Sequence, residues 1–386
     1  MLDEPSIFAD RLVPESAAPP DSTAAAPKDE TVQSLEAAVK AVLAVETIDY
    51  TPPAPIAASF TGHLKVDSEE AFDQIDAHFA PLDYQPMLTT NEKGQHVVMA
   101  IKGRVHPKPR PWWPNVLLLG LTILSLLYAG AAHEAGMRED SSLALWRGWP
   151  YALSMVLILG THELGHYFAA RHHHVNVTLP YFIPAPLGFG TLGAFIQLRE
   201  PMRNNKILFD VGAAGPLAGF IVALPVLIIG LATSHIQPLP TTDYLLEGDS
   251  VLYAGAKYAI FGELLPNDQQ DVFINQLAKA GWTGMFITGL NLIPLGQLDG
   301  GHIVLTLLGR TAQRLYMPLI GLFLVLSLFN SAWLLWTMLL FFLGRIFAVP
   351  MDTVTPLDPR RRQLAYLTMA IFILVFVPSP MQLVQP

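Results

Sequence analysis

Hydrophobic and polar residues are distributed unevenly along this chain of 386 residues. Residues 1–110 mix polar and apolar side chains in ordinary proportions, whereas long uncharged runs fill most of the remaining sequence. A run of about 20 apolar residues matches the hydrocarbon thickness of a bilayer, and no soluble core requires runs of that length. The pattern therefore predicts an α-helical polytopic membrane domain that follows a smaller N-terminal region.

Six apolar runs predict the membrane-spanning helices. They cover residues 111–132, 148–170, 208–233, 274–293, 315–344 and 364–380. The fifth run has Asn330 and Ser331 at its centre, so it is either one long tilted helix or two short crossings. We expect about seven spans, or about six if this run crosses only once.

Basic residues predict the orientation of these spans. Arginine and lysine gather before the first span, after the second, before the third and after the fourth, whereas the loops 133–149 and 234–273 are net acidic. The positive-inside rule then makes the N-terminal region cytoplasmic. The basic residues 360–362 belong on the same side, which requires two crossings between 315 and 349. Because the acidic N-terminus has no apolar signal segment, we expect a bacterial inner membrane protein with a cytoplasmic N-terminus.

The sequence ahead of the first span divides into two parts. Residues 1–57 are rich in Ala, Pro, Asp and Glu and bury too little apolar surface to offset the entropy of ordering, so we expect disorder with one candidate helix at 34–46. Residues 58–105 predict a small α+β cytosolic module. Its expected elements are a strand at 63–66, a helix over 67–82 and strands at 84–90 and 96–103. Its expected role is accessory or docking, with a partner that the sequence does not identify.

Composition narrows the possible functions. The chain is 52% hydrophobic and 14% charged, with a mean hydropathy of +0.38, as membrane proteins are. It contains no cysteine, so any metal must be held by histidine and carboxylate side chains. The net charge of −9, without a basic stripe, argues against a nucleic-acid partner.

His162, Glu163 and His166 form the pattern H-E-x-x-H inside the second apolar run. Positions i and i+4 lie on one face of a helix, so both imidazoles can reach one metal ion, and Glu163 lies beside it as a candidate base for a water that zinc activates. The pattern also arises by chance in soluble helices. Inside a membrane span, however, an acidic residue costs about 2.5–3.5 kcal/mol, so a functional role is favoured here.

A second polar segment runs from Asn291 to His302 at the end of the fourth apolar run. Pro294, Gly296 and the glycine pair after Asp299 predict a broken helix, which is tolerated at membrane depth only when it is buried in protein or lines a cavity. Two histidines and one carboxylate, with a fourth position open to water, are the usual makeup of a hydrolytic zinc site. The alternative role for Asp299 is that of a helix N-cap.

These two segments together resemble the site-2 protease family of intramembrane metalloproteases, in its bacterial and chloroplast branch. That family pairs H-E-x-x-H on one transmembrane helix with a later Asn-x-x-Pro…Asp-Gly segment, and here 137 residues separate His162 from Asp299. The resemblance covers residues 111–350. It implies that His162, His166 and Asp299 bind one Zn²⁺ per chain, that Glu163 is the general base, and that Asn291 lies near the substrate carbonyl. Gly296 departs from the family, which often has a second proline there.

Two glycine-containing segments extend the resemblance. Residues 184–198 resemble the family's re-entrant segment, and the alternation of Leu192, Ala194, Ile196 and Leu198 predicts a strand whose free edge pairs with an unwound substrate. The alternative is an amphipathic linker. The small residues at 212–219 resemble the family's next helix, where they permit close packing.

Two further polar features receive simpler interpretations. Residues 171–174, Arg-His-His-His, look like a metal-binding tract, but they directly follow the second span and are interpreted as a positive, polar helix end. His302 is either a residue that hydrogen-bonds the site or a simple polar neighbour of Gly301.

The sequence therefore predicts an intramembrane zinc metalloprotease that cleaves transmembrane protein substrates near the cytoplasmic side of the lipid bilayer. Residues 351–386 are expected to add a basic loop and a C-terminal transmembrane helix. Two alternatives remain open. An ion- or proton-coupled transporter would show internal repeats with paired broken helices, and none is visible. A non-catalytic membrane adaptor of the same family would have no reason to keep Glu163.

Overall fold

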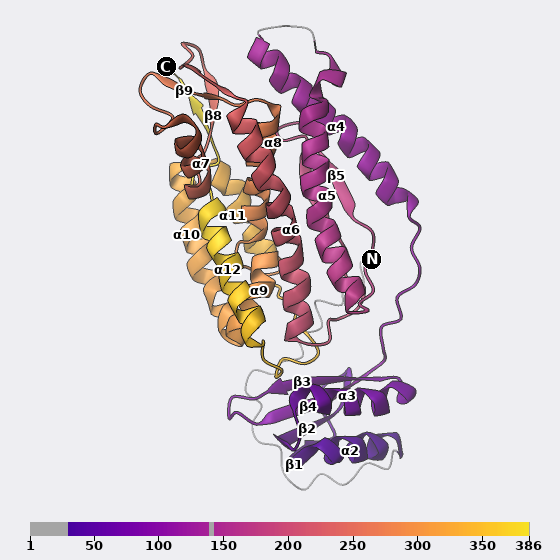
Figure 1. Ribbon diagram of the computed structural model, residues 1–386. Coiled ribbons are helices and arrows are strands. Elements are labelled where there is room, and N and C mark those ends of the chain that lie inside the picture. The colour runs from indigo at the N-terminus through magenta and orange to yellow at the C-terminus, as the bar shows by residue number, and fades with distance from the viewer. Residues whose placement is uncertain (1–29, 139–142, 386) are drawn as a thin grey trace. The chain divides into compact units, whose positions relative to one another are not determined.

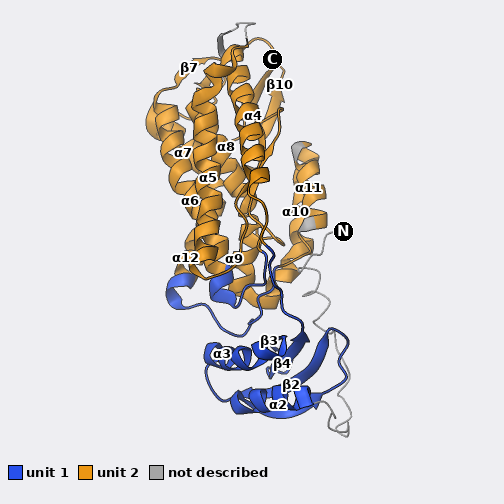
Figure 2. Cartoon of the chain, turned by 90° about the vertical axis from the view of Figure 1, so that its right-hand side faces the viewer, with its two compact units in different colours: residues 1–108, 199–208, 348–361 blue, residues 109–198, 209–347, 362–386 orange. Residues whose placement is uncertain are grey.

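The computed structural model describes residues 30–138 and 143–385, and the chain divides into two compact units (Figures 1 and 2). Unit 1 consists of the N-terminal part up to residue 108 together with residues 199–208 and 348–361. Unit 2 holds the rest. The linear division at residues 105–111 and 350 therefore differs from the structure, because two segments from later in the sequence join the N-terminal module.

Unit 1 contains a four-stranded antiparallel sheet in the order β1-β2-β4-β3, covered by two helices. Its elements are α2 (Glu30–Val42), β1 (Leu43–Asp49), β2 (Ile56–Leu64), α3 (Ser68–Phe79), the short helix η1 (Ala80–Leu82), β3 (Tyr84–Thr90) and β4 (His96–Lys102). The predicted α3, β3 and β4 are confirmed. The predicted first strand begins seven residues too late, since β2 starts at Ile56 rather than at residue 63.

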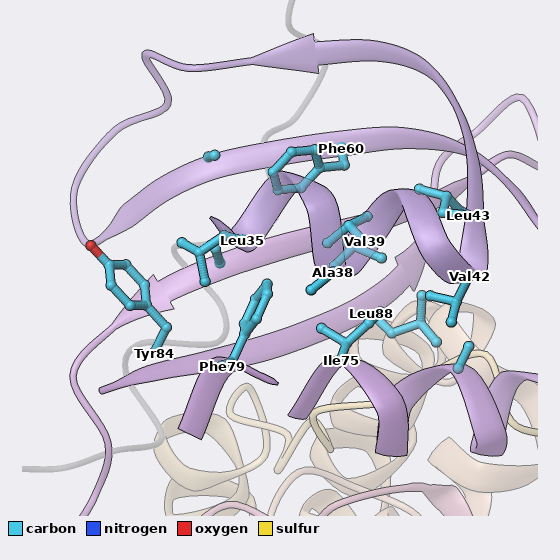
Figure 3. Packing of buried hydrophobic residues seen from close by; sticks show 14 of the residues in the cluster. Leu35, Ala38, Val39, Val42, Leu43, Phe60, Ile75, Phe79, Tyr84 and Leu88 are labelled. Carbon is cyan, nitrogen blue, oxygen red and sulfur yellow. The ribbon is translucent and has the colours of Figure 1, made fainter. Parts of the chain in front are cut away.

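The expectation of disorder over residues 30–57 is wrong. Leu35, Val39 and Val42 of α2 are almost completely buried and lie three or four residues apart, which gives this helix an apolar face. That face packs with Ile75 of α3 and Phe60 of β2 in one core (Figure 3). The composition of residues 1–57 as a whole therefore did not indicate the apolar face that α2 carries. The expected disorder of residues 1–29 lies outside the described residues.

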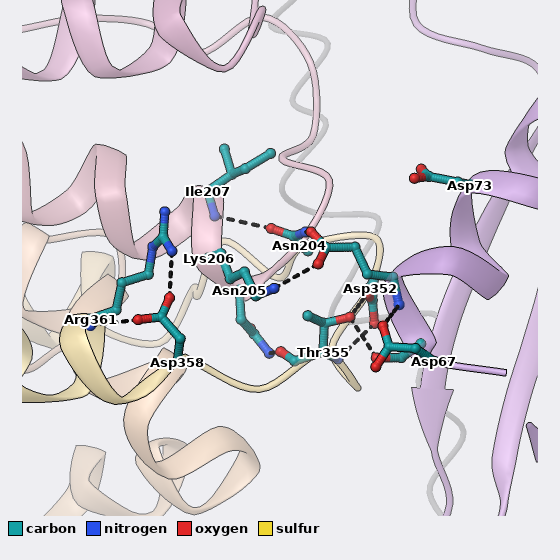
Figure 4. Close-up of polar contacts among 12 residues, drawn as sticks. Asp67, Asp73, Asn204, Asn205, Lys206, Ile207, Asp352, Thr355, Asp358 and Arg361 are labelled. Carbon is teal, nitrogen blue, oxygen red and sulfur yellow. Dashed lines mark hydrogen bonds and ion pairs between the residues drawn. The ribbon is translucent and has the colours of Figure 1, made fainter.

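The two later segments of unit 1 lengthen its sheet beyond β3. Leu88 forms a parallel bridge with Asp352, and Asp352 forms another with Asn204. The Asp352 side chain is fully buried and accepts hydrogen bonds from the backbone N–H groups of Val354 and Thr355 (Figure 4). These segments cover the edge of β3, which would otherwise present unpaired backbone groups.

Unit 2 is predominantly helical. Its helices are α4 (Trp113–Arg138), η2 (Leu145–Gly148), α5 (Trp149–His172), α6 (Asn205–Ala232), α7 (Val251–Phe261), α8 (Gln276–Asn291), α9 (Asp299–Leu308), η3 (Gly309–Leu315), α10 (Tyr316–Phe329), α11 (Ala332–Leu343) and α12 (Pro359–Val375), with the first residues of α6 and α12 belonging to unit 1. Five of the six predicted apolar runs each coincide with one helix, namely α4, α5, α6, α8 or α12. The run at 315–344 forms two helices separated at Asn330 and Ser331.

Three stretches among the described residues are long and apolar enough to cross a membrane. They are Trp113–Gly136, Asn205–Ala232 and Asp299–Phe329. Close helix packing relies on glycine: a Cβ atom on Gly148 would lie 2.0 Å from the Leu127 carbonyl oxygen, and one on Gly281 would lie 2.5 Å from the Leu227 backbone.

Short strands connect the helices of unit 2. They form three antiparallel pairs: β5 (Tyr181–Pro184) with β6 (Thr191–Phe195), β7 (His235–Pro238) with β9 (Gln270–Phe273), and β8 (Tyr244–Glu247) with β10 (Met381–Val384). The strand predicted within residues 184–198 is confirmed as β6. The pairing of β8 with β10 was not predicted, because it joins segments more than a hundred residues apart.

Candidate metal centre

Helix α5 carries the H-E-x-x-H residues in its C-terminal half. Pro150 occupies the first turn, where its missing N–H is harmless, and the helix then runs to His172 without interruption. His162, Glu163 and His166 are 3%, 3% and 6% exposed. Their burial in a long apolar helix requires partners, since isolated ionisable groups are costly to bury.

Asp299 reaches the same place because the chain breaks between α8 and α9. Helix α8 ends at Asn291, and Asp299 is the first residue of α9. The turn between them is tight: a Cβ atom on Gly300 would lie 2.0 Å from the Leu292 carbonyl oxygen, so only glycine fits. The predicted helix break is confirmed. Asp299 is not the N-cap, which is Leu298, so the capping alternative is wrong.

The three predicted metal ligands converge. Nε2 of His162 lies 3.3 Å from Asp299 Oδ2, and Nε2 of His166 lies 3.3 Å from Asp299 Oδ1. The two Nε2 atoms are 3.2 Å apart. Ligand atoms about 2.0–2.1 Å from zinc at tetrahedral angles are separated by about 3.3 Å. The donor atoms and their spacing therefore fit a tetrahedral zinc ion with one position left open.

A backbone carbonyl orients His166. The Nδ1 atom of His166 lies 2.7 Å from the carbonyl oxygen of Val211 in α6. A carbonyl can only accept a hydrogen bond, so Nδ1 carries the proton and the lone pair of Nε2 faces Asp299 and His162. Metal-binding histidines are commonly held in this way by the ring nitrogen that does not bind the metal.

Glycines of α6 make room for both imidazoles. A Cβ atom on Gly215 would lie 2.0 Å from His166 Nε2, and one on Gly219 would lie 3.1 Å from His162 Nδ1. A Cβ atom on Gly212 would likewise lie 3.0 Å from the Cβ atom of His302. The close packing predicted for residues 212–219 is thus present, and it occurs directly at the site.

The hairpin of β5 and β6 approaches the candidate base. The Glu163 carboxylate interacts with the backbone N–H of Ile196, one residue beyond β6. Thr191 anchors the hairpin through its hydroxyl, which donates to the Ile183 carbonyl at 2.8 Å. Leu192 is 76% exposed. Within the described sheets β6 has a single neighbour, β5, so its other edge is not covered by a strand.

Asn291 also belongs to this cluster. Its Nδ2 atom lies 3.3 Å from His162 Nε2, at the end of α8. His302 lies one turn after Asp299, and its buried Nδ1 atom has no hydrogen-bond partner among the described residues. His302 is not one of the three residues whose ligand atoms converge.

Sequence reasoning missed the backbone groups at the site. The Val211 carbonyl and the Ile196 N–H carry no residue-specific signal, because every residue except proline offers the same two groups. The histidine tract at residues 171–174 does not join the metal ligands. Instead, His173 contacts Asp210 of α6, with 2.8 Å between Nε2 and Oδ2.

Two histidines and an aspartate with tetrahedral spacing, set among long apolar helices, form a group that could hold a metal ion, as in hydrolytic zinc sites. Residues 150–328 match Peptidase family M50. This match agrees with the resemblance to the site-2 proteases that the two motifs carry. The broad fold prediction of a helical, membrane-embedded protein is thereby confirmed.

Curated plant proteins are similar over most of the chain. "Probable zinc metalloprotease EGY2, chloroplastic" of Arabidopsis thaliana is 30% identical over 336 residues, which cover 83% of this chain and 60% of that protein. The EGY2 protein of Oryza sativa subsp. japonica is 28% identical, with 82% and 59% covered. "Probable zinc metalloprotease EGY1, chloroplastic" from the same subspecies is 31% identical, with 53% and 40% covered. The chain thus spans about 60% of the length of the EGY2 proteins. No solved structure matches.

These relatives correct one prediction. They are chloroplastic plant proteins, which overturns the expected bacterial inner membrane with its cytoplasmic N-terminus. They also give no support to the transporter alternative, since these relatives are named as metalloproteases.

Proposed function

We propose that this protein is an intramembrane zinc metalloprotease that hydrolyses peptide bonds of membrane-embedded substrates. The observation that carries the proposal is the convergence of His162, His166 and Asp299 at 3.2–3.3 Å, with Glu163 beside them, inside apolar helices. The match of residues 150–328 to Peptidase family M50 and the names of the EGY relatives support it. An adaptor would not need this ligand geometry.

His162, His166 and Asp299 would hold the zinc ion. Zinc bound there polarises a peptide carbonyl and lowers the pKa of water, so that a nucleophile is available near neutral pH. His166 is kept in the tautomer that presents Nε2 by its hydrogen bond to Val211. Asp299 lies in the first turn of α9, where the helix dipole favours its ionised form.

Glu163 is the proposed general base. It accepts a proton from the attacking water and passes it to the departing amine, which is the usual sequence for a single acid–base group. Asn291 is proposed to donate a hydrogen bond to the substrate carbonyl oxygen, since its amide lies beside His162. The apolar surroundings exclude bulk water and strengthen both interactions.

The substrate must unwind before cleavage, because a helix hides its carbonyl groups in i→i+4 hydrogen bonds. The uncovered edge of β6 offers an extended segment a row of backbone partners next to Glu163. We propose that the substrate pairs there as an added strand, and that helix-breaking residues in the substrate accelerate cleavage.

We propose seven crossings, formed by α4, α5, α6, α8, α10, α11 and α12. The pairing of β8 with β10 supports this number, because paired strands must lie on the same side of the membrane. Between them the chain must cross an even number of times, as α8, α10, α11 and α12 do. If α10 and α11 together made one crossing, only three crossings would separate β8 from β10, and the two strands would lie on opposite sides of the membrane. Asn330, between those two helices, also donates to Ser379 Oγ at 2.7 Å, just after α12.

The proposed location is a chloroplast membrane, because the EGY2 relatives are named as chloroplastic proteins. The basic loops would lie on one side of the membrane, and the acidic loop 234–273 on the opposite side. The catalytic half of α5 would then lie nearer the side of the basic loops.

Cleavage by purified protein tests this function. The full chain in detergent is incubated with a model transmembrane substrate, and product is compared for wild type, Glu163→Gln and Glu92→Gln. Glu92 lies exposed in the turn before β4, so the same substitution there is a matched control. We expect cleavage by wild type and Glu92→Gln, and at least about a hundredfold loss in Glu163→Gln. Undiminished cleavage by Glu163→Gln would refute the proposed role of Glu163.

A further inference from the structure

Helices α5 and α6 run antiparallel (Figure 1). The close contacts between them keep a constant register. A Cβ atom on Gly219 would meet His162, and one on Gly215 would meet His166. A Cβ atom on Gly165 would lie 2.6 Å from the Ala214 carbonyl oxygen. As the residue number falls along α5 it rises along α6, so these contacts form one ladder that passes behind the metal ligands.

The ladder continues beyond His166 to the end of α5. His173 follows His166 by seven residues, about two helical turns, and therefore lies on the same face. Its Nε2 atom is 2.8 Å from Asp210 Oδ2, and both side chains are only about a fifth exposed. His172 and His174 on either side are exposed. The tract at residues 171–174 is therefore not uniformly a polar helix end.

Glycine and alanine contacts leave the register of two helices weakly specified. Small side chains form low ridges, so one helix slides or rotates against the other with little steric resistance. A directional polar contact removes this freedom, as single polar residues do in coiled coils. The pair His173–Asp210 is such a contact, and Asp210 directly precedes Val211, whose carbonyl accepts the His166 hydrogen bond.

We propose that His173 and Asp210 are a positioning pair that sets the register of α5 against α6. The pair thereby keeps the Val211 carbonyl oxygen within hydrogen-bonding distance of His166 Nδ1. This inference rests on the proposed function, because His166 is taken as a zinc ligand. Without the pair, α6 shifts, Nδ1 loses its acceptor, and the imidazole no longer favours the tautomer that presents Nε2. Loss of such a supporting hydrogen bond typically weakens metal binding about 10–100-fold.

Zinc affinity of the full chain, measured by competition with a chelator, tests the pair. The variants are His173→Ala, Asp210→Ala, their combination, and the conservative His173→Gln, which keeps a hydrogen-bonding side chain. His174→Asn is the control, because this exposed residue has φ +58° and asparagine tolerates that conformation. We expect a loss of about tenfold in each alanine variant, no further loss in the combination, near-normal affinity in His173→Gln and no change in His174→Asn.

Thermal unfolding of each variant identifies those that do not fold. If the alanine variants are among them, His173→Phe replaces them, because it keeps an aromatic ring and removes the hydrogen bond, and the same loss of about tenfold is expected. Unchanged zinc affinity in folded Asp210→Ala overturns the inference. The inference is also overturned if the loss of zinc affinity in the double alanine variant equals the sum, in free energy, of the losses in the two single variants. A wild-type chain that binds no zinc overturns the proposed function instead. The two failures are therefore distinguishable.

Discussion

At the residue scale, the candidate site combines side chains that the sequence reveals with backbone groups that it hides. His162, His166 and Asp299 could be predicted because few side chains bind metals and their placement in apolar runs is unusual. The hydrogen bond from His166 to Val211 could not, because any backbone carbonyl can accept one. What selects Val211 is the packing of α6, and that packing depends on glycines.

Gly215 gives a direct test of this packing. In Gly215→Ala the new methyl group would lie 2.0 Å from His166 Nε2, so the imidazole must leave its position. We expect zinc affinity and cleavage to fall at least about tenfold. Gly120→Ala is the matched control, because a Cβ atom there meets nothing within 4 Å and alanine favours the helix. A Gly215→Ala protein with wild-type zinc affinity would show that α6 does not confine His166.

At the element scale, local patterns predicted the long helices and failed where distant segments meet. The candidate helix at residues 34–46 overlaps α2, but its place in a folded unit was missed, because its apolar face follows a stretch rich in alanine, proline and acidic residues and composition averages the two. Strands β8 and β10 are four residues each and pair with one another although more than 130 residues separate them in the sequence. Such short strands have no periodicity of their own, so only the tertiary structure identifies them.

Strand β8 ends on a glutamate whose ionisation should affect its stability. Burial raises the pKa of Glu247 to about 7, although the Tyr253 hydroxyl donates to its carboxylate at 2.8 Å. Asp271 raises this pKa further, and Lys257 lowers it. Because the folded-state pKa lies above the ordinary value, the stabilising contribution is complete below about pH 4.5 and is lost as the pH rises through about 7.

Hydrogen exchange measures this effect locally. Amides of β8 and β10, corrected for intrinsic exchange, should be better protected at about pH 5 than at about pH 8. Glu247→Gln should remove this difference, whereas Glu263→Gln in the same loop should keep it. Equal protection at both pH values in the wild type would contradict the expected titration.

At the scale of the whole molecule, the chain is organised by contacts between segments far apart in sequence. Glu69 of α3 accepts hydrogen bonds from Asn204 and Lys206, which lie nearly 140 residues later. No local pattern indicates such a partner, so the module was predicted to end at residue 105. The alternation of basic and acidic loops, in contrast, follows from the sequence alone and agrees with the seven crossings proposed from the β8–β10 pairing.

Single cysteines test the number of crossings, since the native chain has none. We expect an impermeant thiol reagent to label Ser331→Cys from the same side as Thr241→Cys and from the side opposite Glu92→Cys. With only six crossings, residue 331 would lie within the bilayer and stay unlabelled. Labelling of Ser331→Cys together with Glu92→Cys would likewise contradict the topology.

The most direct test of the central claim is the zinc content of the purified full chain by elemental analysis, for wild type, Asp299→Ala and Asp268→Ala. Asp268 is an exposed aspartate of the loop 234–273, so it controls for the substitution itself. The account predicts about one zinc per chain in wild type and in Asp268→Ala, and far less in Asp299→Ala. A wild-type protein without zinc, or an Asp299→Ala protein that retains it fully, would contradict the account.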